Sequence, residues 1–455
     1  MKSIVGTDPH CAPSERRSSD PPTRSGPDIG HNDVVTPTPT ESGRHSGTQR
    51  PFHLLAKPTG ASCNLDCTYC FFLSKDALYP EGSTRMSPST LEAYIGQLID
   101  AQPDGEVNVA WQGGEPTLIG VEFFRRALTL AEASKRPNQT LVHTVQTNGT
   151  LLDSDWIALF GDFGVLVGLS IDGPADMHDR FRVAKNGAPT HAAVESAWFD
   201  LRKAGIDTNV LCSLSTANVD RPLDVYRYFR DDLGAEHLQF IPIVERADSL
   251  TLEIAEKGWS DKPGRRRILY QQRGDLVTSR SISGRQYGDF LVAVYDEWIR
   301  RDVGRVFVNL FDVTLGSHLG LHTLCVHSPT CGDALALEHN GDVYSCDHFV
   351  EPDHLLGNVH ETPLRFLVDD PRQIAFGRHK QSSLPRMCRE CDVLFACHGG
   401  CPKDRFAVTP DGDGGLNHLC DGYLNFFRHT RPTMQTMARL VATGRYADEI
   451  MSTDR

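Results

Sequence analysis

The sequence has no long hydrophobic run and no excess of positive charge. No stretch of about eighteen consecutive apolar residues occurs in the 455-residue chain, and we therefore expect no transmembrane helix. The N-terminus lacks the apolar core of a signal peptide, since Arg16 and Arg17 precede Ser-Ser-Asp-Pro-Pro. The net charge of −13 argues against a nucleic acid or an anionic membrane as partner, because both bind concentrated positive charge.

Residues 1–50 contain hardly any aromatic or long aliphatic side chain. A segment this rich in Pro, Ser, Thr and Gly buries too little apolar surface to offset its ordering entropy, so we expect it to be disordered. His10 and Cys11 within it are expected to have no function. The rest of the chain exceeds the limit of about 250–300 residues for a single core, which predicts two folded domains.

The thirteen cysteines indicate metal ligation in a reducing cytoplasm rather than disulfides. Cys63, Cys67 and Cys70 have the spacing C-x3-C-x2-C, and thiols this close on one loop would strain as disulfides. Thiolates select soft metals. A [4Fe–4S] cluster normally takes four cysteines, so three would leave one iron open to bind a small molecule. The alternative is a zinc knuckle whose fourth ligand lies elsewhere.

Eight further cysteines lie between residues 325 and 420. This number suffices for two complete [4Fe–4S] clusters or for a pair of zinc sites. The eight are Cys325, Cys331, Cys346, Cys388, Cys391, Cys397, Cys401 and Cys420. Cys212 lies instead within an apolar run and is predicted to be a small core residue.

The middle of the chain alternates apolar runs with amphipathic stretches. This pattern predicts an α/β domain with a parallel sheet covered by helices, curved into an open barrel by right-handed crossovers. The predicted strands are 52–56, 106–111, 141–146, 165–171, 207–214 and 238–243. The predicted helices are 88–101, 121–135, 153–161, 191–204 and 221–232. Functional residues in such barrels lie at the C-terminal ends of the strands.

Three motifs lie at these strand ends. Gly113 and Gly114 let the backbone approach a ligand closely, and Glu115 could accept a hydrogen bond from an ammonium group. Residues 146–149 and 170–174 follow the next two strands and could contact a ribose or a carboxylate. Each motif could equally be an ordinary turn or helix cap.

The loop of Cys63, Cys67 and Cys70, with Tyr69 before its last cysteine, resembles the signature of radical S-adenosylmethionine (SAM) enzymes. The resemblance covers about residues 52–430 and implies that the open iron chelates the amino and carboxylate groups of SAM. It implies a partial (β/α)6 barrel over residues 51–315. The positions that match the SAM contacts of the family are Tyr69, Gly114, Glu115, Ser170, Arg182 and Val244. Arg182 could bind a carboxylate bidentately, and Val244 would be an apolar neighbour of the adenine.

The second cysteine group resembles the SPASM iron–sulfur domain, which residues 316–455 would form together with a C-terminal helix. By this resemblance, auxiliary cluster I takes Cys325, Cys331, Cys346 and Cys401. Auxiliary cluster II takes Cys388, Cys391, Cys397 and Cys420. Because the ligands of the two clusters alternate along the chain, one loop would carry ligands of both clusters and fix the distance between them.

The dipeptide Cys346-Asp347 is the motif that most specifically resembles one family of radical SAM enzymes. In anaerobic sulfatase-maturating enzymes the matching aspartate is the catalytic base. The resemblance implies oxidation of a Cys or Ser residue of a sulfatase to Cα-formylglycine, with three [4Fe–4S] clusters and SAM as cofactors. The implied partners are an unfolded sulfatase polypeptide with a Cys/Ser-x-Pro-x-Arg motif and an electron donor such as flavodoxin or ferredoxin. Position 72 departs from the pattern, because it is Phe where several relatives carry Tyr.

Two other functions are compatible with the same motifs. A SPASM-type enzyme could introduce a thioether or carbon–carbon crosslink into another ribosomally made peptide. A non-catalytic iron–sulfur electron carrier is also conceivable, although it would have no use for an open iron. The basic run Arg265–Arg267 is expected to be a solvated loop, with substrate docking as the alternative.

Overall fold

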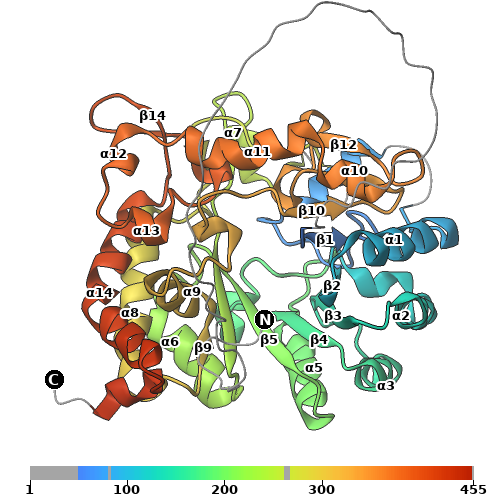
Figure 1. Cartoon of the computed structure of the whole chain (residues 1–455), viewed down its shortest axis with the longest axis horizontal. Helices are drawn as coiled ribbons and strands as arrows, with labels where there is room; N and C mark the ends of the chain where they lie inside the picture. Colours follow the sequence, from blue (N-terminus) through green and yellow to red (C-terminus); the bar gives the residue numbers. More distant parts are fainter. Residues whose placement is uncertain (1–49, 80–83, 261–266, 453–455) are drawn as a thin grey trace, which may run out of the picture.

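The computed structural model describes residues 50–79, 84–260 and 267–452. Its centre is one sheet of ten strands in the order β12-β11-β10-β1-β2-β3-β4-β5-β6-β9 (Figure 1). The prediction of disorder for residues 1–50, and of no function for His10 and Cys11, falls outside the described residues apart from Arg50.

The six predicted strands are confirmed, each within two residues of its predicted bounds. Every neighbouring pair among them is parallel. They are β1 (His53–Ala56), β2 (Gly105–Trp111), β3 (Gln139–Thr147), β4 (Leu166–Ser170), β5 (Thr208–Leu214) and β6 (His237–Pro242). Because β12 and β9 are the two edges of the sheet, the barrel is open, as predicted.

The predicted helices between these strands are also present. Their starts follow local capping rules, since Ser87 accepts a hydrogen bond from the Thr90 amide and Asp153 accepts from the Trp156 amide. The predicted helices are α1 (Pro88–Ala101), α2 (Val121–Ser134), α3 (Ser154–Phe163), α5 (His191–Lys203) and α6 (Pro222–Arg227). The short helix α4 (Ala175–His178), after β4, was not predicted. The predicted helix 221–232 continues beyond α6 as a π-helical turn, Tyr228–Asp232.

A segment that the sequence analysis did not resolve into elements follows β6. It contains the small sheet of β7 (Arg246–Ala247) and β8 (Leu276–Val277), with α7 (Leu252–Glu256) between them. The chain then forms α8 (Gly284–Arg301), β9 (Phe307–Val308) and α9 (Asn309–His318). β9 extends the parallel sheet beside β6. A strand of two residues has no detectable period, which is why the sequence did not predict it.

The C-terminal region adds three strands to the same sheet. β10 (Ala334–Leu337) pairs in parallel with β1, and β11 (Asp342–Tyr344) and β12 (Leu355–Asn358) follow in antiparallel order. The region that carries the second cysteine group therefore continues the barrel sheet. The predicted domain boundary between residues 315 and 316 lies within α9 and stays a prediction.

The remaining elements lie along one end of the sheet and beside α8, where they are orange and red in Figure 1. They are α10 (Leu364–Val368), α11 (Pro371–Ser382), α12 (Arg386–Arg389), α13 (Leu394–Cys397), β13 (Ala407–Val408), β14 (Gly414–Leu416) and α14 (Cys420–Ala442). The predicted C-terminal helix is α14. It crosses α8 so closely that a Cβ on Gly288 would lie 2.7 Å from the Cα of Gly422. Only glycine allows this approach of two backbones.

Two large hydrophobic cores stabilise the sheet. One lies under β1–β4 and includes Tyr94 and Phe124 of α1 and α2, and the other joins β4–β6 to α8, α9 and α14. Cys212 is fully buried in the second core, which confirms the prediction for it. Among the described residues, no helix has both the length and the apolar character that crossing a membrane requires.

Candidate active site and cysteine groups

The first cysteine group lies on the loop that follows β1. Leu65, Cys67 and Tyr69 are buried together, with Cys63 and Cys70 packed against them. The loop is tied to the region after β4, because the Asp66 amide donates to the Val183 carbonyl over 2.8 Å. The three predicted cysteines therefore share one site at the C-terminal end of β1.

Burial and mutual repulsion disfavour the thiolate form of these cysteines. Burial, together with the charge of Cys70, raises the pKa of Cys67 to about 12, although Arg182 opposes the shift. Burial, Glu115 and the two neighbouring cysteines likewise raise the pKa of Cys63. A bound metal deprotonates its thiol ligands outright, so an iron–sulfur cluster would provide the positive charge that this site needs.

The Gly-Gly turn after β2 packs against the backbone of the cysteine loop. The Gly114 amide donates to the Gly60 carbonyl over 2.9 Å, and the Glu115 amide donates to the Ser62 carbonyl over 2.8 Å. A Cβ on Gly114 would lie 2.1 Å from the Ser62 oxygen. These amides therefore bind the protein backbone, and glycine is required at position 114 by this contact. A contact of Gly114 with SAM stays a prediction.

Glu115 is fully buried and joins three strand ends. Its Oε1 accepts hydrogen bonds from the hydroxyls of Thr117 and Thr147, at 2.6 and 2.7 Å, and from the Thr117 amide. Its Oε2 accepts from the Asn148 amide over 2.8 Å. A carboxylate offers about four acceptor sites, and the four protein donors named here already match that number. Its predicted contact with SAM is not tested by these bonds.

A buried triad joins the ends of β4 and β5 to the cysteine loop. Asp172 accepts hydrogen bonds from the Tyr69 hydroxyl, from Nε of Arg182 at 2.8 Å and from the Ser213 amide at 2.8 Å. The Arg182 guanidinium also lies 5.6 Å from the ring centre of Tyr69. Two predicted SAM contacts are thus adjacent. Sequence reasoning gave Asp172 no role, although it lies inside the strand-end motif 170–174.

The other two predicted SAM contacts also lie at strand ends. The Ser170 hydroxyl accepts a hydrogen bond from Nε2 of Gln146 over 2.9 Å. Val244 follows β6 and lines a pocket that reaches from the cysteine loop to the segment after Cys346. The pocket is lined by Tyr69, Phe71, Ile241, Pro242, Ile243, Val244, Glu245, Tyr270, Gln272, His348 and Lys403.

Asp347 precedes His348, which lines this pocket, and it forms an ion pair with Lys57. Burial alone would raise the pKa of Asp347, but the positive charge of Lys57 and the neighbouring His348 and Lys75 lower it below its usual value. Asp347 is therefore an ionised carboxylate that can accept a proton.

Lys57 is a functional candidate that sequence reasoning missed. It lies directly after β1, is fully buried, and its Nζ is 3.4 Å from the ring centre of Phe72 and 4.0 Å from Glu338. Phe72, the departure from the family pattern, thus stacks under the ammonium group. The only signal in the sequence was a lysine at the end of the first strand, where buried charge is unusual.

The cysteines predicted for auxiliary cluster I act on one another electrostatically. Burial and the neighbouring thiols raise the pKa of Cys346, that of Cys331 to about 11 and that of Cys401 to about 12. Cys325 is among the thiols that cause each of these shifts. These residues come from distant parts of the chain, and their assignment to one cluster stays a prediction.

Lys380 of α11 stabilises the loop that starts at Cys325. Its buried Nζ donates to the carbonyls of Cys325 and Val326, at 2.8 and 3.0 Å, and to that of Ser328. Burial lowers the pKa of Lys380 to about 8, while the nearby thiols oppose this shift. A buried cation therefore lies beside the predicted ligands of auxiliary cluster I.

The four cysteines predicted for auxiliary cluster II line one small cavity. Cys388, Cys391, Cys397 and Cys420 lie around it with apolar neighbours such as Val393 and Leu424. Burial and the other three thiols raise the pKa of Cys397 to about 12. The residues present fit an iron–sulfur cluster on this observation.

Among the described residues, no three His, Cys, Asp or Glu side chains form a group suited to a single metal ion. The twelve described cysteines are all free thiols. The members of each cysteine group were identified by the residues that surround them and by the effect of each thiol on the pKa of the others.

Arg267 is the described member of the run Arg265–Arg267. Its side chain is only 9% exposed, and it forms an ion pair with Asp66 at 2.6 Å. It also donates to the carbonyls of Cys67 and Cys70, each over 3.4 Å. The expectation of a solvated residue is wrong for Arg267, because the segment after β6 folds back onto the cysteine loop.

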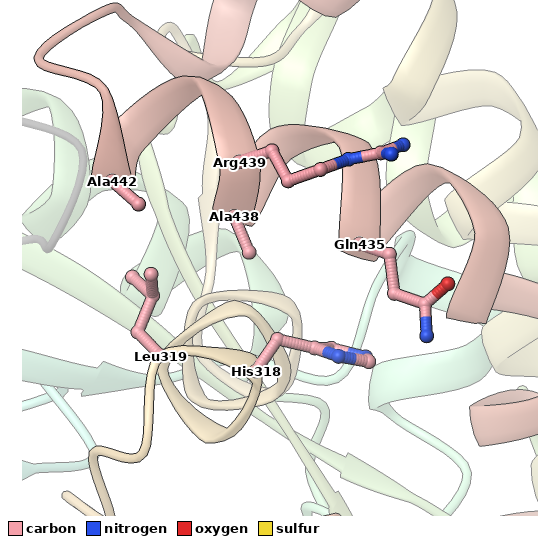
Figure 2. A pocket seen from close by; sticks show the side chains of 6 residues that line it. All are labelled: His318, Leu319, Gln435, Ala438, Arg439 and Ala442. Carbon is pink, nitrogen blue, oxygen red and sulfur yellow. The ribbon is translucent and has the colours of Figure 1, made fainter.

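A separate pocket lies between the end of α9 and the last turns of α14, and it contains none of the predicted site residues. Figure 2 shows His318, the last residue of α9, and the following Leu319 opposite four side chains of α14: Gln435, Ala438, Arg439 and Ala442. We assign no function to this pocket.

Two protein-family models match parts of this chain, and full-length relatives match most of it. Residues 58–228 match the model of the radical SAM superfamily, and residues 329–392 match that of the SPASM iron–sulfur cluster-binding domain. The chain is 39% identical over 393 residues to a serine-type anaerobic sulfatase-maturating enzyme of Bacteroides thetaiotaomicron, which covers 86% of this chain and 92% of that enzyme.

A cysteine-type anaerobic sulfatase-maturating enzyme of Clostridium perfringens is 30% identical over 392 residues, covering 85% of this chain and 98% of that enzyme. A solved structure of native anSMEcpe with bound AdoMet and the Cp18Cys peptide superposes with a TM-score of 0.72. It is 28% identical and covers 86% of this chain and 100% of that chain.

Proposed function

The chain belongs to the anaerobic sulfatase-maturating enzymes, and we propose that Asp347 is the catalytic base and Lys57 the residue that orients it. The enzyme is a radical SAM oxidoreductase that converts a Ser or Cys residue of a sulfatase to Cα-formylglycine. The observation that supports the assignment is the ion pair between Asp347 and Lys57, formed next in sequence to His348, which lines a pocket together with Tyr69 and Val244. Family membership replaces the two alternative functions considered from the sequence.

The enzyme uses SAM and three [4Fe–4S] clusters. We propose that Cys63, Cys67 and Cys70 hold the cluster that binds SAM. The two auxiliary clusters would be held by Cys325, Cys331, Cys346 and Cys401, and by Cys388, Cys391, Cys397 and Cys420. When bound and reduced, these cofactors supply a 5′-deoxyadenosyl radical that removes hydrogen from the substrate Cβ, and a route for the second electron.

The proposed work of the protein is to bind, orient and deprotonate. Tyr69, Gly114, Glu115, Ser170, Arg182 and Val244 would surround SAM at the strand ends. The carboxylate of Asp347 would take the proton from the substrate thiol or hydroxyl, which lets the Cβ become a thioaldehyde or an aldehyde. A thioaldehyde from Cys would then be hydrolysed by water to the aldehyde, with release of hydrogen sulfide. Lys57 keeps this carboxylate ionised and fixed, because an opposite charge favours the ionised form.

The substrate is a sulfatase peptide, and we propose that it is an unfolded chain with a Cys/Ser-x-Pro-x-Arg motif. Flavodoxin or ferredoxin would deliver electrons, as the family resemblance implies. We also propose a cytoplasmic location, because iron–sulfur ligation by so many free thiols requires reducing surroundings.

The decisive experiment is mass spectrometry on two matched peptides, one with Cys-x-Pro-x-Arg and one with Ser in place of Cys. Each is incubated anaerobically with reconstituted enzyme, SAM and a reductant. We expect an aldehyde on at least one peptide, with 5′-deoxyadenosine formed in equal amount. Cleavage of SAM without oxidation of either peptide would contradict the assignment.

A further inference from the structure

A single short turn connects the two auxiliary cysteine groups. Cys397 belongs to the group predicted for cluster II and Cys401 to that for cluster I, with only His398, Gly399 and Gly400 between them. All three intervening residues are in the left-handed region, with φ of 47°, 72° and 63°. This conformation is strained for His398, since a side chain disfavours it.

The carbonyls of this turn converge on Arg405. The guanidinium donates from Nε to Gly399 over 2.9 Å, and from Nη2 to His398 over 2.7 Å and to Gly400 over 3.1 Å. Its Nη1 donates to the carbonyl of Lys380. A planar, forked cation can satisfy several carbonyls at once, so Arg405 holds the turn in its strained shape.

The same guanidinium lies close to both cysteine groups, because the carbonyls of His398 and Gly400 that it binds are next in sequence to Cys397 and Cys401. Burial lowers the pKa of Arg405, and thiols of both groups oppose this shift. These thiols are Cys388 and Cys397 of one group and Cys401 and Cys331 of the other. Two other cations differ from Arg405 in position: Lys380 binds the carbonyls of Cys325 and Val326, and Arg389 directly follows Cys388 and binds the Leu384 carbonyl.

We propose that Arg405 is a positioning residue that links the two auxiliary clusters: it fixes the Cys397–Cys401 turn, and its charge raises the reduction potential of both clusters. The inference rests on the cluster assignment proposed above. Reduction adds negative charge to a cluster, and a fixed nearby cation stabilises that charge. The carbonyls that bind the guanidinium carry no net charge, so the positive charge of Arg405 is not cancelled.

The test is a redox titration of the full-length reconstituted enzyme, followed by electron paramagnetic resonance, for wild type and Arg405→Gln. We expect the reduction equilibrium constants of both auxiliary clusters to fall on the order of tenfold, about 59 mV for a one-electron couple. The cluster on Cys63, Cys67 and Cys70 should keep its potential, which makes it an internal reference.

Arg389→Gln is the matched control, because Arg389 directly follows Cys388 and binds the Leu384 carbonyl rather than the Cys397–Cys401 turn. It should shift the potential of auxiliary cluster II and leave cluster I unchanged. An Arg405→Gln enzyme in which only one auxiliary potential moves, or in which neither moves, would overturn the proposal.

Arg405→Lys keeps the test valid if Arg405→Gln fails to bind its iron. Lysine retains the charge but lacks the fork that binds several carbonyls. We expect both auxiliary potentials to move in the same direction as in Arg405→Gln, by a smaller amount. A shift of one cluster alone would again refute the role of Arg405.

These potentials are measured without any sulfatase peptide. A failure of formylglycine formation in the wild-type enzyme would therefore be distinguished from a failure of the Arg405 proposal. Iron and sulfide content of the wild type tests the cluster assignment on its own.

Discussion

The two cysteine regions are built on different principles. In the first, three cysteines lie on one loop at the end of β1, and buried carboxylates, Glu115 and Asp172, hold the surrounding strand ends together. In the second, the cysteines are spread between residues 325 and 420. Two cations, the buried Lys380 and the half-buried Arg405, bind the backbone carbonyls around them.

The difference follows from how far apart the cysteines of each region lie in the sequence. The first three cysteines are on one short loop, so the neighbouring residues need only fix the position of that loop against the sheet. Scattered ligands depend on turns that leave carbonyls without partners, and a buried cation satisfies several carbonyls while offsetting thiolate charge. Asp347 and Lys57 lie where the two regions meet.

The variant with the largest expected effect, Cys67→Ala, tests whether the two cysteine regions bind their iron independently. Cys67→Ala removes a ligand of the first group only, so SAM cleavage should be lost completely while the iron of the auxiliary clusters remains. The measurement is iron content together with 5′-deoxyadenosine formation. Loss of all iron in this variant would show that the regions do not assemble independently.

Asp347→Asn tests the junction between the regions. It preserves the shape of the side chain but removes the base, so formylglycine formation should fall about 10²–10⁴-fold. 5′-Deoxyadenosine should still form, because Asp347 is not among the residues around the first cysteine group. The ratio of aldehyde to 5′-deoxyadenosine measures this uncoupling; an unchanged ratio would exclude Asp347 as the base.

Lys57→Met should give a smaller loss at the same junction. The methionine fills a similar space but no longer orients the Asp347 carboxylate, and such misplacement reduces a rate by roughly 10²-fold. Peptide turnover under saturating SAM is the measurement. Lys135→Met is the control, because Lys135 pairs with Glu132 at the surface, and it should behave like wild type.

Gly114→Ala should have the smallest effect and tests how tightly the first loop is packed. The added Cβ would meet the Ser62 carbonyl at 2.1 Å, and overpacking of this kind destabilises by about 1–3 kcal/mol. Gly96→Ala is the matched control. It has open space within helix α1 and should stabilise by about 0.5–1 kcal/mol. Denaturant unfolding of both variants compares the free energies; equal stabilities would contradict the close packing.

Much of the fold could be predicted from the sequence because strands β1–β6 and their helices carry local signals. Alternating apolar runs, capping residues such as Ser87 and Asp153, and strand-end turns act within a few neighbours. β9 was missed because two residues carry no period. The pairing of β10 with β1 was missed because it joins residues about 280 positions apart, His53 with Ala334, by backbone hydrogen bonds that any residue types can form.

The candidate site shows the same division. The spacing of Cys63, Cys67 and Cys70 indicates its chemistry within eight residues, and the resemblance of Cys346-Asp347 to a known family supplied the proposed base. Lys57 and Asp172 were missed because their partners lie 290 and 103 positions away along the chain. A single sequence carries no signal for such pairs.

The sequence by itself determined strands β1–β6, the helices between them and the spacing of the cysteines, because periodicity and spacing are local properties, and the family resemblance of its motifs indicated the reaction. Only the tertiary structure decided which charged groups lie together. It paired Lys57 with Asp347, buried Arg267 against the cysteine loop, and bound Arg405 to the turn between Cys397 and Cys401. Electrostatic effects depend on distance and burial in space, and these are fixed only when the chain has folded.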